Sequence, residues 1–152
     1  MSIIQGVGSG EVSTGFYTHS INQSLRFNPA DNPYLERTMV TPTDNKKFTI
    51  AFWIKRANLG SSQMIISAAT SGASYIQFQS DDTIKVRGSG NLEIETVRVF
   101  RDVGSWYHIV WQVDADNSTS KIWVNGVEQS INSGAQPISG YSYTMNQAGK
   151  HM

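Results

Sequence analysis

The sequence predicts an all-β fold, an antiparallel β-sandwich of the jelly-roll type. About ten short segments rich in β-branched and aromatic residues follow one another, and turn-forming Gly, Ser, Asn and Asp residues separate them. Residues 48–130 show no helical period. A chain of 152 residues is long enough for one domain with a core and short for two.

Two segments are predicted to form the central strands. Residues 106–113 read Trp-Tyr-His-Ile-Val-Trp-Gln-Val, with apolar residues at both parities, which indicates a mid-sheet strand with two apolar faces. Residues 48–55 read Phe-Thr-Ile-Ala-Phe-Trp-Ile-Lys, so that Phe52 and the two isoleucines point to one face and Trp53 to the other. Together the two segments hold three of the four tryptophans.

The remaining strands are expected on both sides of these two segments. Turn formers at residues 28–33 predict a hairpin or corner between the first two strands. Asn125-Gly126 predicts a type I′ hairpin, because both residues accept a positive φ. The further strands are expected at residues 24–27, 34–37, 64–68, 75–79, 83–87, 92–100 and 121–124.

The first residues differ in composition from the rest of the chain. Residues 1–15 are rich in glycine and serine, which predicts a flexible N-terminal arm before a jelly-roll domain at 16–152. That domain divides into a core at 24–130 and a C-terminal tail at 131–152. The side chains through which the arm could contact a partner during assembly are Ile3, Ile4, Phe16 and Tyr17.

Composition excludes several classes of partner. Lys plus Arg equal Asp plus Glu at 12 each, so no net field favours nucleic acid. There is no cysteine, which excludes disulfides and thiolate metal sites. No apolar run has transmembrane length, and residues 1–10 lack the features of a signal peptide. We therefore expect a soluble chain without membrane insertion.

Several segments carry a family resemblance. Four segments resemble, in this order, successive strands of concanavalin A-like, laminin-G-like jelly rolls. They are Ser24-Leu25-Arg26-Phe27-Asn28 with Tyr34-Leu35, residues 48–55, Trp106-Tyr107-His108-Ile109-Val110, and Ile122-Trp123-Val124-Asn125-Gly126-Val127. More narrowly, they are similar to the versions in structural proteins of tailed bacteriophages, particularly marine ones. The resemblance implies two stacked, curved antiparallel sheets, often with a rim that binds glycan or protein.

The end of the chain departs from that family. Its members continue past the equivalent of residues 149–152 with a last strand that pairs near the first one. This chain stops there, so we expect a jelly roll that lacks the last strand. Either the jelly roll is truncated, or the sequence is a piece of a longer protein, or a partner completes the sheet. An open sheet edge in this position would be ready to pair with another chain.

The same resemblance raises the question of catalysis. Laminarinase-type hydrolases, which share this jelly roll, carry carboxylates in the order Glu-x-Asp-x-x-Glu on one strand. Here Glu93 and Glu95 share a face, but Val97 and Arg98 follow and the third carboxylate is missing. We expect no enzyme, and a solvated strand face balanced by Arg87 and Arg98.

Four aromatic residues are candidates for sugar binding, which needs aromatic rings with polar groups nearby. They are Trp123, Tyr75, Tyr141 and Tyr143. The alternative is that Trp123 covers the outer side of its sheet and the two later tyrosines fasten the C-terminal tail.

One loop gathers oxygen ligands. Asp114, Asp116 and Asn117 could form a calcium site, as Asp31 with Asn32 could in another loop. The same residue types are common in turns, so we expect no cofactor, with Ca²⁺ as the alternative. The three histidines are far apart in sequence, and we expect them to be structural.

Three function hypotheses follow. The first is a non-enzymatic bacteriophage virion accessory protein, a capsid or tail knob or decoration, made as a soluble chain in the host cytoplasm and located on the virion surface. It would contact other virion proteins and have affinity for host surface polysaccharide. The second is a carbohydrate-binding adhesin module of a tail fibre, which would need a shaft or second domain. A hydrolase is the third and weakest.

Overall fold

The computed structural model describes residues 24–68, 74–88 and 92–152. The chain divides into two compact units, Met1–Tyr34 and Leu35–Met152. Within the described part of the first unit, the short 3-10 helix η1 (Pro29–Asp31) forms the predicted turn. Residues 24–27 have no strand partner there, so the predicted strand and its hairpin are wrong. The four arm residues, Ile3, Ile4, Phe16 and Tyr17, lie outside the described residues.

The second unit is built from strands. In chain order they are β1 (Arg37–Met39), β2 (Lys47–Ile54), β3 (Gln63–Ala68), β4 (Ser74–Phe78), β5 (Ile84–Arg87), β6 (Glu93–Thr96), β7 (Tyr107–Asp114), β8 (Thr119–Val124), β9 (Val127–Glu128), β10 (Ile131–Ala135) and β11 (Gly149–His151). A second 3-10 helix, η2 (Thr144–Asn146), precedes β11.

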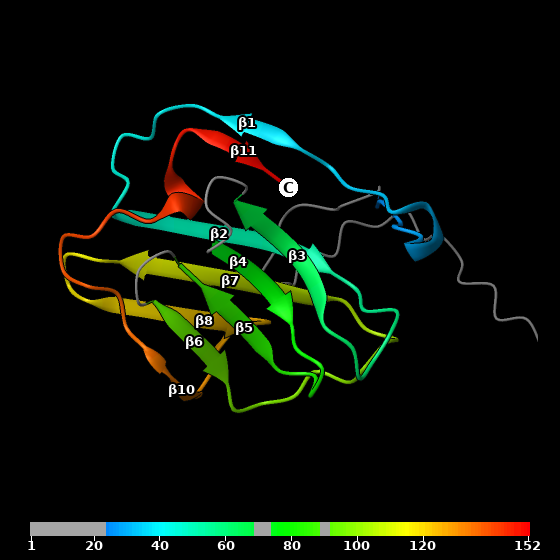
Figure 1. Cartoon of the computed structure of the whole chain (residues 1–152). Helices are drawn as coiled ribbons and strands as arrows, with labels where there is room; N and C mark the ends of the chain where they lie inside the picture. The colour runs from blue at the N-terminus through cyan, green and yellow to red at the C-terminus, as the bar shows by residue number, and fades with distance from the viewer. Residues whose placement is uncertain (1–23, 69–73, 89–91) are drawn as a thin grey trace, which may run out of the picture. The chain divides into compact units, whose positions relative to one another are not determined.

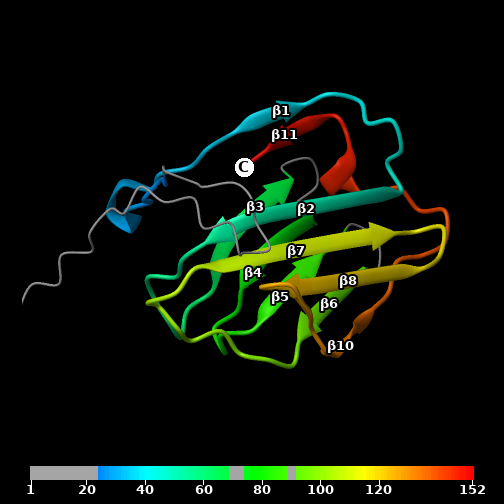
Figure 2. The ribbon, with the colours of Figure 1, turned by 180° about the vertical axis from the view of Figure 1, so that it is seen from behind.

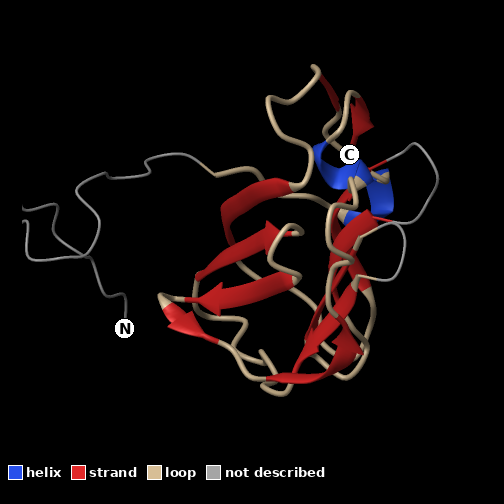
Figure 3. Ribbon diagram, turned by 90° about the vertical axis from the view of Figure 1, so that its left-hand side faces the viewer, coloured by secondary structure: helices blue, strands red, loops and turns tan. Residues whose placement is uncertain are grey.

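These strands form two antiparallel sheets, which confirms the predicted sandwich. One sheet has seven strands in the order β1-β11-β3-β4-β5-β6-β10, and the other has four in the order β2-β7-β8-β9 (Figures 1 and 2). Turned by 90°, the two sheets lie as facing layers (Figure 3). Within the described residues, no helix is long and apolar enough to cross a membrane.

The central position of β7 is confirmed. It lies between β2 and β8, pairing with all eight residues of β2, for example Trp111 with Ile50. Only one of its faces is buried, however: Gln112 is exposed and the other outward residues are half-buried, so the expectation of two apolar faces is wrong. The physical reason is that no further layer covers the four-stranded sheet among the described residues. The buried residues of β7 are Tyr107, Ile109, Trp111 and Val113.

The core fills the space between the sheets. Trp111 is 0% exposed, its Nε1 donates to Ser120 Oγ at 2.9 Å, and Phe48 packs edge-on against it at 5.2 Å. The apolar residues of alternate strand positions complete the core, as the predicted period of two requires. Among them are Ile76, Phe78, Ile84, Val86, Ile94, Ile122 and Val124.

The C-terminal residues belong to the seven-stranded sheet. β11 pairs with β1 on one side, where His151 lies opposite Arg37, and with β3 on the other. Met152 N donates to Ser67 O at 2.8 Å, and Ser67 N donates back to Met152 O at 2.6 Å. The expectation that no strand lies beside the first one is thus corrected: residues 149–151 occupy that position.

Two local predictions have different outcomes. Asn125 and Gly126 have φ values of 52° and 79°, which confirms the hairpin turn. The strand expected at 92–100 is shorter, because Thr96 Oγ1 accepts from Ile84 N at 3.0 Å and donates to Arg98 O at 2.9 Å. A side chain thereby takes the place of a ladder partner and the strand ends.

Candidate functional site

Two tryptophans lie on the outer face of the four-stranded sheet. Trp53 of β2 is 40% exposed and Trp123 of β8 is half-buried. Val110 of β7 lies between its two strand partners, Ala51 of β2 and Trp123 of β8. Two residues further along β2, Trp53 pairs with His108 of β7. We call Trp53, His108, Val110 and Trp123 the tryptophan face. They form a diagonal row across β2, β7 and β8, because alternate residues of neighbouring strands point to the same side.

The rings of the tryptophan face have defined neighbours. The Trp53 and His108 rings stack at 4.9 Å with an interplanar angle of 28°. Lys121 Nζ lies 5.9 Å from the centroid of the Trp123 ring and 3.1 Å from Glu128 Oε2. Trp53 and Trp123 are two strands and two residues apart, which places their Cα atoms about 12 Å from each other. That distance exceeds twice the length of one pyranose unit.

Polar side chains border this face. Thr49, Gln112 and Lys121 form the next row in register, on the same side of the sheet. Asn125 Oδ1 accepts from His108 N at 2.8 Å, which ties the β8–β9 turn to β7. An aromatic surface with hydroxyl, amide and ammonium groups beside it can stack on a sugar ring and bond its hydroxyls.

The structure does not gather the four predicted sugar-binding residues. Trp123 lies on the tryptophan face, whereas Tyr75 points outward from β4 in the other sheet. Tyr141 is partly exposed in the loop after β10, with its ring 5.0 Å from that of Tyr143.

Tyr143 is a core residue, and its prediction as a surface aromatic is corrected. It is buried, and its hydroxyl accepts from Ile138 N at 2.9 Å. Burial raises its pKa. A Cβ added at Gly88 would lie 2.6 Å from the Tyr143 ring, so the strand β5 ends where this ring needs space. Tyr143 therefore fastens the C-terminal segment, as the alternative reading of the tyrosines had it.

Sequence reasoning placed Trp53 on the outer side of its strand but did not include it in the sugar site. The signal was present in residues 48–55, where the apolar core residues Ile50, Phe52 and Ile54 occupy the even positions. Trp53 stands at an odd position and so points to the opposite side, as Trp123 does between the buried Ile122 and Val124. A shared outer face follows only once β2 and β8 are known to flank β7.

The paired carboxylates Glu93 and Glu95 lie on the outer face of the seven-stranded sheet. Lys85 Nζ is 2.6 Å from Glu93 Oε1 and 4.0 Å from Glu95 Oε2, and Arg87 Nε is 3.4 Å from Glu93 Oε2. The hydrogen bond to Glu93 raises the pKa of Lys85. Arg87 offsets the negative charge of this face as expected. Arg98 was expected to do the same, but its guanidinium lies 5.4 Å from the centroid of the Phe100 ring.

In the loop that was considered as an alternative calcium site, the side chains have partners within the chain. Asn117 Nδ2 donates to Asp114 Oδ2 at 2.8 Å, which lowers the pKa of Asp114. Lys47 Nζ lies 3.1 Å from Asp116 Oδ2, and Lys46 Nζ lies 3.9 Å from the other oxygen of that carboxylate. Throughout residues 24–68, 74–88 and 92–152, no group of three or more His, Cys, Asp or Glu side chains could hold a metal ion.

Two of the three histidines fall in the described residues, and they lie in different sheets. His108 of β7 stacks on Trp53, and His151 of β11 has its ring nitrogens 3.2 Å from Gly149 O and from Met145 O. These contacts are those of structural histidines, while His19 lies outside the described part of the chain.

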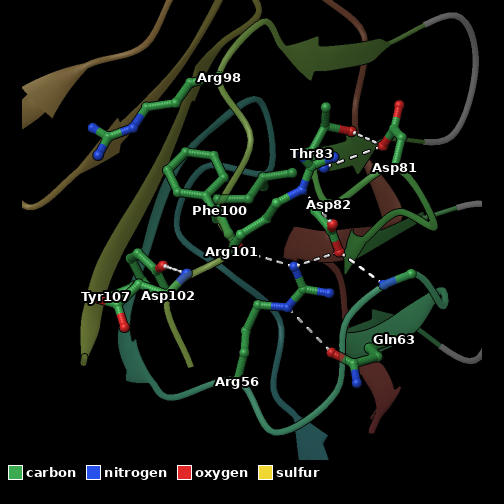
Figure 4. Close-up of polar contacts among 12 residues, drawn as sticks. Arg56, Gln63, Asp81, Asp82, Thr83, Arg98, Phe100, Arg101, Asp102 and Tyr107 are labelled. Atoms are coloured by element: carbon green, nitrogen blue, oxygen red, sulfur yellow. Dashed lines mark hydrogen bonds and ion pairs between the residues drawn. The ribbon is translucent and has the colours of Figure 1, made fainter. Parts of the chain in front are cut away.

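A buried ionic cluster at one end of the sandwich was not predicted. Asp82 accepts from Arg56 Nη1 at 3.0 Å, from Gly60 N at 3.0 Å and from Arg101 Nε at 2.9 Å (Figure 4). Arg56 Nη1 also donates to Phe100 O at 2.7 Å. Three connections, those from β2 to β3, from β4 to β5 and from β6 to β7, are held together in this way.

This cluster stabilises the three connections structurally and is not a proton-transfer site. Hydrogen bonds from Gly60 N and Arg101, followed by Arg56, lower the pKa of Asp82 to about 2. A carboxylate with that pKa remains ionised near neutral pH and accepts hydrogen bonds only. The residues next to Asp82 in the sequence did not indicate this cluster, because the hydrogen-bond partners of Asp82 lie 19 to 26 residues away from it.

Comparison with protein families agrees with this architecture. The model of the concanavalin A-like lectin/glucanases superfamily matches residues 29–152. The chain belongs to this superfamily. No curated protein matches the sequence. Membership of a lectin/glucanase superfamily indicates a carbohydrate-binding or protein-binding module. The exposed Trp53 and the half-buried Trp123 on the outer sheet face are consistent with that class.

Proposed function

We propose that this concanavalin A-like domain is a non-catalytic carbohydrate-binding module and that the tryptophan face holds a polysaccharide chain. The observation that carries the proposal is the placement of Trp53 and Trp123 on one outer face, at the separation estimated above. Aromatic rings stack on the C–H faces of sugars, and two rings at this distance fit a chain better than a single sugar.

The charges around this face favour an uncharged polysaccharide. Lys121 is paired with Glu128 at 3.1 Å, and Lys47 with Asp116 at 3.1 Å. Ion pairs of this kind leave little net charge to attract an acidic polymer. Binding strength would then come from stacking and from hydrogen bonds, and it should depend only weakly on salt.

The absence of turnover is part of the proposal. Glycoside hydrolysis needs two carboxyl groups on either side of the scissile bond, one of them protonated. Glu93 and Glu95 are neighbours on one strand that share Lys85, and they lie on the sheet opposite to the tryptophan face. The carboxylate pair and the aromatic surface therefore lie on different sheets, and this separation supports binding without hydrolysis.

The test is a screen of neutral polysaccharides by affinity electrophoresis, followed by calorimetry with the best one. Trp123→Ala should weaken binding about tenfold, which corresponds to about 1.4 kcal/mol. The matched control is Tyr75→Ala, because Tyr75 is an aromatic residue that points outward from β4 in the other sheet. Equal losses in both variants, or no loss in Trp123→Ala, would contradict the proposal.

A second candidate is an accessory protein on the surface of a phage particle, with capsid or tail proteins as partners and host polysaccharide as the ligand. The sequence resemblance motivates it. Exposed Val97, Val99 and Val103 in the connection from β6 to β7 support it, since they offer apolar surface to a protein partner.

This second candidate is tested by mass spectrometry of particles purified from a culture that expresses the chain. Recovery of the chain with the particles in fixed proportion to the other virion proteins is the expected result. Recovery only in the particle-free supernatant would rule it out. An adhesin role within a fibre would instead give recovery with tail fractions alone.

A further inference from the structure

A third tryptophan lies next to the tryptophan face. Trp106 immediately precedes β7 in the chain, and its side chain is 46% exposed. Within β7 the buried positions alternate with the outer ones: Tyr107 is buried, whereas His108 and Val110 belong to the outer face. Side chains of an extended segment alternate between its two sides. Trp106 therefore stands on the same side of the sheet as His108.

The strand register gives the distances from Trp106 to the other two tryptophans. Trp106 lies two residues before His108, which pairs with Trp53 of β2, so the Cα atoms of Trp106 and Trp53 are about 8 Å apart. Trp123 of β8 pairs with Val110, four residues after Trp106, which puts the Cα atoms of Trp123 and Trp106 about 14 Å apart. The strands β2, β7 and β8 lie side by side (Figure 2), so the three tryptophans form one row along the direction of β7.

The turn before β7 holds the backbone around Trp106 in place. Asp102 N donates to the Tyr107 hydroxyl at 2.9 Å, and Tyr107 is itself buried. The Asp102 carboxylate accepts from Gly104 N at 2.7 Å and from Ser105 Oγ at 2.5 Å. Trp106 is therefore flanked on one side by a turn with its own hydrogen bonds and on the other by a core residue. A ring positioned in this way before binding loses less conformational freedom when a ligand stacks on it.

The charges beside Trp106 offset each other. Lys55 directly follows β2, just as Trp106 directly precedes β7, and the last pair of the ladder joins the residues next to them. The hydrogen bond from Ser105, followed by that from Gly104 N, lowers the pKa of Asp102, and the positive charge of Lys55 contributes to this shift. Asp102 is therefore ionised near neutral pH and offsets the charge of Lys55. This end of the row thus suits an uncharged ligand, as the rest of the tryptophan face does.

We propose that Trp106 is a third stacking residue and that the ligand is a neutral polysaccharide chain, bound along β7 over about four pyranose units. The span of about 14 Å from Trp123 to Trp106 is about three pyranose lengths, so a chain that contacts both rings presents about four units. This inference rests on the proposed function, because it concerns the same face and the same class of ligand. It adds a binding residue and the length of chain that the protein recognises.

A row of three rings makes affinity depend on the length of the chain. One ring that stacks on one sugar contributes about tenfold in affinity. When one chain reaches several rings, the loss of translational and rotational freedom occurs only once, so each further ring adds to the affinity. The affinity should therefore rise with each sugar unit until the chain spans the row from Trp123 to Trp106, and units beyond that should add little.

Calorimetry with oligosaccharides of about two to six units, prepared from the best neutral polysaccharide of the screen, tests this inference. For the unmodified protein, Kd should fall with chain length up to about four units and then stay level. Trp106→Ala should weaken the binding of four-unit and longer chains about tenfold. The same variant should change the binding of two-unit chains by less than about twofold, because these still fit on the tryptophan face without Trp106.

Two control variants separate stacking from other effects. Trp106→Phe keeps a ring and should retain most of the affinity for four-unit chains, and Tyr75→Ala, on the other sheet, should bind every chain as the unmodified protein does. If Trp106→Ala keeps the parental affinity at every length while Trp123→Ala is weakened, this inference is overturned and the proposed function stands. A loss in Trp106→Ala that is equal at all lengths also overturns it. If the unmodified protein binds no neutral polysaccharide, both fail.

Discussion

Replacing Trp111 with alanine should remove most of the stability of the domain. The side chain is 0% exposed, and such a substitution costs about 3–5 kcal/mol through lost burial and the cavity left behind. Trp111 Nε1 also donates to Ser120 Oγ at 2.9 Å, and an unpaired buried hydroxyl costs about 1 kcal/mol more. The sum approaches the total stability of a small domain, about 5–15 kcal/mol.

Urea unfolding followed by circular dichroism measures this effect. With a slope of about 2 kcal/mol per molar urea, a loss of about 5 kcal/mol lowers the midpoint by about 2.5 M. Trp106→Ala is the control, because that side chain is 46% exposed and its loss should cost less than about 0.5 kcal/mol. A Trp111→Ala variant within about 1 kcal/mol of the parent, with an unchanged slope, would refute this account of the core.

Two further predictions concern charged residues. Asp82→Ala should cost about 3–5 kcal/mol, since it leaves the buried Arg56 guanidinium without its carboxylate. The pKa of Asp82 is lowered from 3.8 to about 2, so its contribution is complete above pH 3.8 and is lost as the pH falls toward 2. The difference in melting temperature between parent and variant should shrink over that interval; a constant difference would contradict it. Glu95→Gln should be nearly silent in a thermal melt, because the amide keeps an oxygen for the Thr83 hydroxyl; a loss of several degrees would show that this face has another role.

Local patterns predicted the parts of the fold that depend on neighbours in the chain. The alternation in residues 48–55 and 106–113 placed β2 and β7 to within about a residue, and it identified Trp111 as core. Asn125-Gly126 predicted its hairpin because the requirement for positive φ lies in the two residues themselves.

Features that depend on distant contacts could not be predicted. Tyr143 is buried because the chain returns across Gly88, and β11 exists because β1 and β3 leave a position between them. The tryptophan face needs the order β2-β7-β8, which no local pattern contains. Residues 24–27 show the converse: their alternation resembles a strand, yet a strand forms only with a partner for its backbone.

The proposed function requires that the tryptophan face binds polysaccharide without cleaving it. The most direct measurement incubates the protein with its best neutral polysaccharide and follows both gel retardation and the release of reducing ends. We expect retardation that is lost in a Trp53→Ala, Trp123→Ala double variant and kept in Tyr75→Ala, with no increase in reducing ends. Retardation that survives in the double variant, or reducing ends that accumulate with time, would contradict the claim.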